Sequence, residues 1–93
     1  MKKYIDLIER VSKGDILPRE FEIDFYHPYM DDKNADRYDE NYQDFFDLIC
    51  EKLDTTSTKI DIESREYGWI TYEEFLDWLI EQYTIFQKYR NKQ

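Results

Sequence analysis

The strongest structural signal in this chain is the stretch ITYEEFLDWLIEQYTIFQKY, residues 70–89. Thr71 and Glu74 have the spacing of a capping box, in which each side chain accepts a hydrogen bond from the backbone N–H of the other. The stretch therefore predicts an amphipathic helix over residues 72–89. Its inner apolar stripe is formed by Tyr72, Phe75, Leu76, Leu79, Tyr83 and Phe86.

A second apolar stripe on the same segment, formed by Trp78, Ile85 and Tyr89, lies to one side of the first. A domain of 93 residues can hardly spare a Trp from its core. We therefore expect this stripe to pack on the first or second helix, near Tyr4 or Phe25. The alternative is that the stripe is the interface of an oligomerising helical module.

Helical periodicity predicts two helices in the first thirty residues. The first covers residues 2–13 and ends at Gly14. The second covers residues 17–27, with Asp15 as its cap and Pro28 as its end. Their apolar stripes are Tyr4, Leu7, Ile8 and Val11 in the first, and Leu17, Phe21 and Phe25 in the second.

A third helix is predicted over residues 39–53, and a long connection of residues 54–70 separates it from the fourth. Ile60 and Ile62 alternate with charged residues, so we expect a short extended piece within that connection. Two Gly and two Pro are too few for the turns of an all-β protein. We expect an all-α fold: a single domain, residues 1–93, that forms a compact antiparallel four-helix bundle.

Composition indicates the setting in which such a protein works. The single Cys cannot form a disulfide within the chain, which favours a reducing compartment. No apolar run has the length of a signal peptide or of a membrane-spanning helix. We therefore expect a cytoplasmic protein that does not bind membranes and is a monomer when free.

The negative charge is concentrated in the middle of the chain. The net charge is −9, and residues 15–68 alone carry six basic and sixteen acidic groups, a net charge of −10. Binding to nucleic-acid phosphates requires basic groups, so direct nucleic-acid binding is not expected. Because complementary potentials steer association, a basic protein is the expected partner.

Five acidic residues of the third helix recur at steps of four and three, opposite its apolar stripe: Glu40, Asp44, Asp47, Glu51 and Asp54. At 1.5 Å per residue this acidic row is about 21 Å long. Neighbouring like charges at this spacing cost about 0.2–0.5 kcal/mol each, and no cation is interleaved. We interpret the row as a surface that meets a basic groove; the alternative is an ordinary solvated face. Asp61 and Glu63, in the connection, complete the predicted partner-binding set.

Other possible sites are poorly supported by the sequence. Asp32, Asn34 and Asp36 occupy the first ligand positions of a calcium loop, but Arg37 and Gln43 replace its Gly and its Glu. There is one His and one Cys, and no Gly-rich phosphate loop. We therefore expect no cofactor, no metal site and no enzymatic activity.

Three stretches resemble the small immunity proteins of the colicin D type, a family found with bacteriocins and contact-dependent inhibition toxins. They are ILPREFEIDFYHPY (residues 16–29), FFDLICEKLD (residues 45–54) and YGWITYEEFLDWLIEQY (residues 67–83). The resemblance implies a helical bundle that blocks the active site of a cognate nuclease toxin, typically a tRNase, with acids in place of RNA phosphates. Glu51 and Asp54 match the acidic end of the family's third helix.

Two other functions are compatible with the same residues. A phage-type nucleic-acid mimic, such as an anti-CRISPR protein, would use the same acidic surface on a different target. An oligomerising module would use the stripe of Trp78, Ile85 and Tyr89 instead of the acids.

Overall fold

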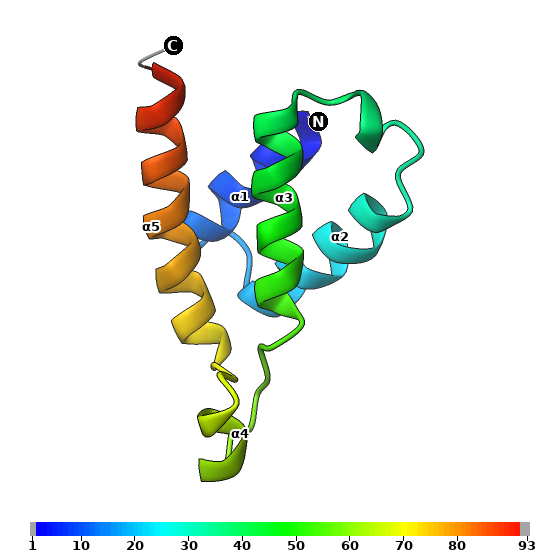
Figure 1. Cartoon of the computed structure of the whole chain (residues 1–93). Coiled ribbons are helices and arrows are strands. Elements are labelled where there is room, and N and C mark those ends of the chain that lie inside the picture. The colour runs from blue at the N-terminus through cyan, green and yellow to red at the C-terminus, as the bar shows by residue number, and fades with distance from the viewer. Residues whose placement is uncertain (1, 92–93) are drawn as a thin grey trace.

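The computed structural model describes residues 2–91, and within that range its regular secondary structure is entirely helical. The elements are α1 (Lys2–Ser12), α2 (Pro18–Met30), the 3₁₀ turn η1 (Ala35–Arg37), α3 (Glu40–Leu53), α4 (Ile62–Glu66) and α5 (Tyr72–Asn91). In Figure 1, α3 and α5 run side by side in opposite directions, while α1 and α2 cross behind α3. The all-α prediction is confirmed.

The turn between α1 and α2 is closed by the backbone. Gly14 has φ of +82°, and the N–H of Asp15 donates to the carbonyl of Arg10 at 2.9 Å, which closes the last turn of α1. Gly14 therefore ends α1 as predicted. The prediction that Asp15 caps α2 is wrong, because the residue preceding α2 is Leu17, which makes no side-chain cap. Pro18 opens α2, where its missing N–H is not needed.

Helix α2 does not end before Pro28, as we expected, but continues to Met30. A proline in the final turn removes only one helix hydrogen bond, and the N–H of Asp31 still donates to the carbonyl of His27 at 2.9 Å. The continuation keeps Tyr29 on the apolar face of α2, where its ring stacks on Phe25 with centroids 5.8 Å apart. Burial of this ring favours the extra turn.

The connection of residues 54–70 contains a fifth helix where we expected a short extended piece. α4 begins at Ile62, and the carboxylate of Asp61 caps it by accepting from the N–H of Ser64 at 2.7 Å. The ends of the connection are joined by an isolated parallel bridge between Thr56 and Ile70. The connection is thus a closed loop that carries α4 at the lower end of the view in Figure 1.

The core is largely aromatic and is centred on Tyr4, which is completely buried. Its ring lies 5.5–5.6 Å, between centroids, from the rings of Phe25, Tyr29 and Phe46, all in edge-to-face contact. Such pairs contribute about 0.5–1.5 kcal/mol each beyond the burial of their area. Tyr4 thereby joins α1 to both α2 and α3. Further completely buried side chains are Ile8, Val11, Phe21, Phe25, Phe46, Ile49, Phe75 and Leu79.

The prediction that the second stripe of α5 is buried is wrong for Ile85 and Tyr89, whereas Trp78 does pack against the core. Ile85 and Tyr89 are 52% and 53% exposed. Trp78 is half-buried, with the Lys52 ammonium of α3 lying 5.6 Å from its ring centroid. The inner stripe, as predicted, supplies the core contacts, since Phe75 and Leu79 are completely buried. Ile85 and Tyr89 are therefore left beside α3 and open to solvent.

The predicted capping box at the start of α5 is confirmed. Thr71 Oγ1 accepts from the N–H of Glu74 at 3.2 Å, and Glu74 Oε1 accepts from the N–H of Thr71 at 3.1 Å. The Glu74 carboxylate also pairs with Arg65 of α4 at 2.7 Å. One side chain thus joins the end of the connection to the first turn of α5.

We expect Thr71→Ala to lower the free energy of unfolding by about 1 kcal/mol, because the N–H of Glu74 loses its acceptor. Chemical denaturation measures this change. Thr58→Ala, at an exposed position, is the matched control and should stay within about 0.5 kcal/mol of the wild type. Equal effects of the two substitutions would show that the capping box contributes nothing.

Candidate protein-binding face

The acidic row of α3 lies on the outer face of that helix. All five members, Glu40, Asp44, Asp47, Glu51 and Asp54, are exposed, whereas Phe46 and Ile49 on the opposite side are completely buried. The structure therefore places the predicted row on one solvent-facing surface.

Two members of the row are held by tyrosines of α2. The hydroxyl of Tyr29 donates to Asp47 at 2.9 Å, and the hydroxyl of Tyr26 donates to Asp54 at 2.6 Å. The bond to Asp54 raises the pKa of Tyr26 to about 12, and burial together with the bond to Asp47 raises the pKa of Tyr29. These two acids therefore join α3 to α2, a role that the spacing within α3 does not reveal.

The other three members, Glu40, Asp44 and Glu51, accept no side-chain hydrogen bond and form no ion pair within residues 2–91. The ion pairs in that range are Arg10 with Asp6 at 3.0 Å and Arg65 with Glu74 at 2.7 Å. Among the described residues, no ion pair thus offsets the repulsion between neighbouring carboxylates of the row. We call Glu40, Asp44 and Glu51 the free acids; they are available to a partner.

The two remaining predicted site residues lie on another element. Asp61 caps α4, and its bonds from Ser64 lower its pKa. Glu63 is exposed in the first turn of the same helix. Figure 1 places α4 beyond the C-terminal end of α3, so the structure does not bring these two acids onto the row.

A shallow groove between α3 and α5 adjoins the row and was not predicted. Leu48, Ile85 and Tyr89 are its exposed apolar side chains, Phe45 and Phe86 are the more buried ones, and Asp44 stands on its edge. The apolar stripe that the sequence predicts for α3 does not include Leu48; its members are Tyr42, Phe45, Phe46, Ile49 and Leu53. The position of Leu48 three residues after Phe45 was the sequence signal that could have placed both side chains on one apolar surface. Only the placement of α5 makes that surface part of a groove.

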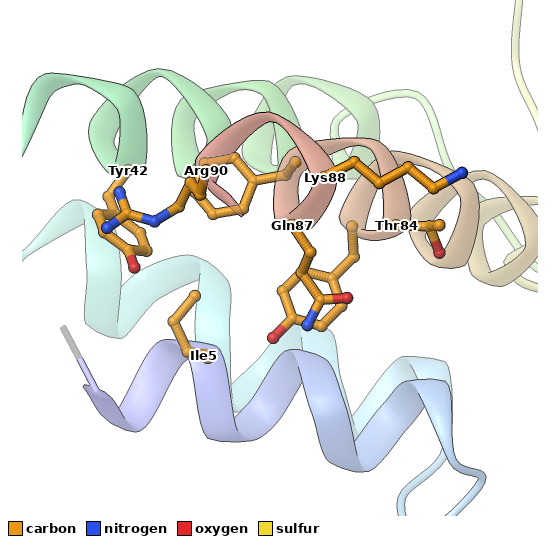
Figure 2. A pocket seen from close by; sticks show the side chains of 8 residues that line it. Ile5, Tyr42, Thr84, Gln87, Lys88 and Arg90 are labelled. Carbon is orange, nitrogen blue, oxygen red and sulfur yellow. The ribbon is translucent and has the colours of Figure 1, made fainter. Parts of the chain in front are cut away.

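A separate hollow of about 460 Å³ lies between α1 and the C-terminal half of α5 (Figure 2). Arg90 lies over the ring of Tyr42, with its guanidinium carbon 4.2 Å from the centroid. Lys88 is the second cation of the lining, and the remaining residues are Ile5, Tyr83, Thr84, Phe86 and Gln87. This lining contains no carboxylate, so the hollow is electrostatically the reverse of the acidic row.

The single cysteine and the single histidine lie in different environments. Cys50 is 5% exposed, and burial, followed by the charges of Asp47 and Asp54, raises the pKa of its thiol to about 12. At neutral pH the thiol is therefore protonated and a poor nucleophile. His27 is exposed near the end of α2.

The calcium-like stretch has a structural role. Asp32 accepts from the hydroxyls of Tyr4 and Tyr38 at 2.7 and 2.6 Å, and from the N–H of Asn34 at 2.9 Å. These bonds lower the pKa of Asp32 to about 2. Across residues 2–91 no group of three or more His, Cys, Asp or Glu side chains is arranged to hold a metal ion.

Comparison with protein families, with curated proteins and with solved structures finds no match. The resemblance to immunity proteins consequently depends on the three stretches of sequence alone. Among the described helices, none has the length and hydropathy needed to cross a membrane.

Substitutions within the acidic row should separate the acids that stabilise the fold from the free acids. Asp47→Ala should lower the free energy of unfolding by about 1 kcal/mol, since the largely buried Tyr29 loses its closer acceptor and keeps only the Gln43 carbonyl at 3.5 Å. Glu51→Ala, the control in the same row, should change it by no more than about 0.5 kcal/mol. Urea denaturation distinguishes them, and equal losses would contradict the division.

The Asp32 bonds predict a specific dependence on pH. Folding lowers the pKa of this carboxyl from 3.8 to about 2, so the stability that it contributes is present above 3.8 and is lost as the pH falls toward 2. The difference in free energy of unfolding between the wild type and Asp32→Asn should therefore shrink as the pH falls from 3.8 toward 2. Asp31→Asn, at the exposed neighbouring residue, should show no such convergence when acid denaturation is followed by circular dichroism.

Proposed function

We propose that this protein is an inhibitor of the immunity type, which binds a basic nuclease toxin and occupies the surface where that toxin binds nucleic acid. The observation that carries the proposal is the set of free acids, Glu40, Asp44 and Glu51, which face solvent and form no ion pair with any of residues 2–91. Along the helix axis these carboxylates are about 6 and 10.5 Å apart. Such a row can take the place of phosphates on a basic surface.

The distribution of charge supports the same function. Residues 15–68, which include the whole of α3, carry a net charge of −10, and the rest of the chain carries +1. The basic groups of α5 that line a pocket, Lys88 and Arg90, belong to the hollow on the α1 side. A basic partner would therefore be steered toward α3, and association would slow as salt is added.

In this proposal the protein acts in the cytoplasm as a free monomer, without a cofactor, and contacts neither membrane nor nucleic acid. The nuclease-toxin target follows from the resemblance to colicin D-type immunity proteins, and the partner's basic character follows from the free acids. A phage-type nucleic-acid mimic, such as an anti-CRISPR protein, remains the second candidate, because it would present the same carboxylates. A toxin gene beside the gene for this protein would favour immunity, and phage genes would favour the mimic.

The test is charge reversal at the free acids. The variant Glu40→Lys, Asp44→Lys and Glu51→Lys changes the net charge by +6, from −9 to −3. Wild-type protein should capture a basic protein from a lysate of the source organism at low salt, inhibit its nuclease activity and release it as salt rises. The variant should neither capture nor inhibit that protein, because its affinity should be lower by at least about 100-fold.

The matched control is Asp15→Lys, Asp24→Lys and Asp31→Lys, which changes the net charge equally at exposed positions away from α3. It should retain most of the binding and all of the inhibition. If the two triple variants bind the captured protein equally well, the acidic row is only a solvated face and the proposal is wrong.

A further inference from the structure

The groove between α3 and α5 is an apolar surface beside the free acids. Its volume is about 290 Å³, which is at the lower limit of small-molecule pockets. The exposed fractions of Leu48, Ile85 and Tyr89 are 41%, 52% and 53%, and Asn41, Asp44 and Gln82 supply the polar part of the lining. Such a shallow surface suits a row of side chains from another protein better than an enclosed ligand.

The length of the groove matches two turns of a helix. On α3 it extends from Asn41 to Leu48, seven residues or about 10.5 Å. Side chains at positions i, i+4 and i+7 of an amphipathic helix span the same distance. Two antiparallel helices with an apolar groove between them are a common receptor for a helix of this kind.

The charges around the groove favour an occupant of opposite charge. Asp44 lies in the lining itself, and Glu40 and Glu51 belong to the same row. On α5, the exposed Glu81 precedes Ile85 by four residues and therefore lies on a neighbouring part of the helix surface. No cation is part of the lining. Lys88 lines the other hollow, and Lys52 lies over Trp78.

We propose that this groove docks an amphipathic basic helix of the partner, with its apolar side chains on Leu48, Ile85 and Tyr89 and its Lys or Arg side chains on the flanking carboxylates. The inference rests on the proposed function and adds the shape of the ligand to it. A second copy of this chain is a poor occupant. Packing two grooves face to face would bring two acidic rows together and place two net charges of −9 in one complex.

The probe is a synthetic amidated helical peptide of about 18 residues. It carries Leu at i, i+4 and i+7 and Lys on both sides of that stripe. A second peptide has the three Leu replaced by Ala, which preserves charge and helix propensity. Fluorescence anisotropy at low salt measures the affinity of each peptide, and sedimentation measures self-association.

The groove variant is Ile85→Ala with Tyr89→Ala, and the chain offers a close control in Ile62→Ala with Tyr67→Ala. The control pair has the same residue types, is 82% and 76% exposed, and lies at α4, away from the groove. All four side chains are exposed, so both variants should fold, which circular dichroism verifies.

The Leu peptide should bind the wild type and the α4 control alike, and the groove variant about tenfold more weakly. The Ala peptide should bind all three proteins with the same lower affinity. Equal binding of both peptides to all three proteins would overturn the groove while leaving the acidic row, and hence the proposed function, in place. Absence of binding by the Leu peptide would also overturn it. So would a wild-type dimer that the groove variant abolishes, since the occupant would then be a second copy.

Discussion

The contacts of Tyr4 are the constraint on which the rest of this structure depends. Its ring is completely buried and meets aromatic rings of α2 and α3, while its hydroxyl donates to Asp32 at 2.7 Å. The same carboxylate accepts from Tyr38, so one side chain of α1 orders both the core and the segment that leads into α3. A small domain with little apolar surface to bury gains much from side chains that combine a large ring with a polar end.

The orientation of α3 follows from this arrangement. Phe46 and Ile49 must face the core, and Tyr26 and Tyr29 of α2 hold Asp54 and Asp47 at the edge of the contact. The rotation of α3 about its axis is thereby set from both sides. Glu40, Asp44 and Glu51 are left facing outward, so the bonds that stabilise the α2–α3 contact also present the carboxylates that we assign to partner binding.

The same geometry explains why apolar and acidic groups adjoin on one surface. The inner stripe of α5 supplies its core contacts, and Ile85 and Tyr89 consequently remain beside Leu48 instead of being buried under α1 or α2. Apolar contact supplies affinity at the centre of an interface, and flanking charge supplies steering and selectivity. A surface that combines them suits a partner that is basic and amphipathic.

Periodicity and capping chemistry in the sequence were sufficient to predict the helical class, the four long helices, the end of α1 at Gly14 and the start of α5 at Thr71, because these depend on residues within a turn of one another. The outward direction of the acidic row was predictable for the same reason. The extension of α2 past Pro28, the helix α4 and the exposure of Ile85 and Tyr89 were not, since each depends on which elements pack together. The division of the row was hidden too: Tyr29 and Asp47 are 18 residues apart, and Tyr26 and Asp54 are 28 apart. Only tertiary packing decides which carboxylates receive a hydroxyl and which remain free, because a hydrogen bond between distant residues requires both helices to be in place.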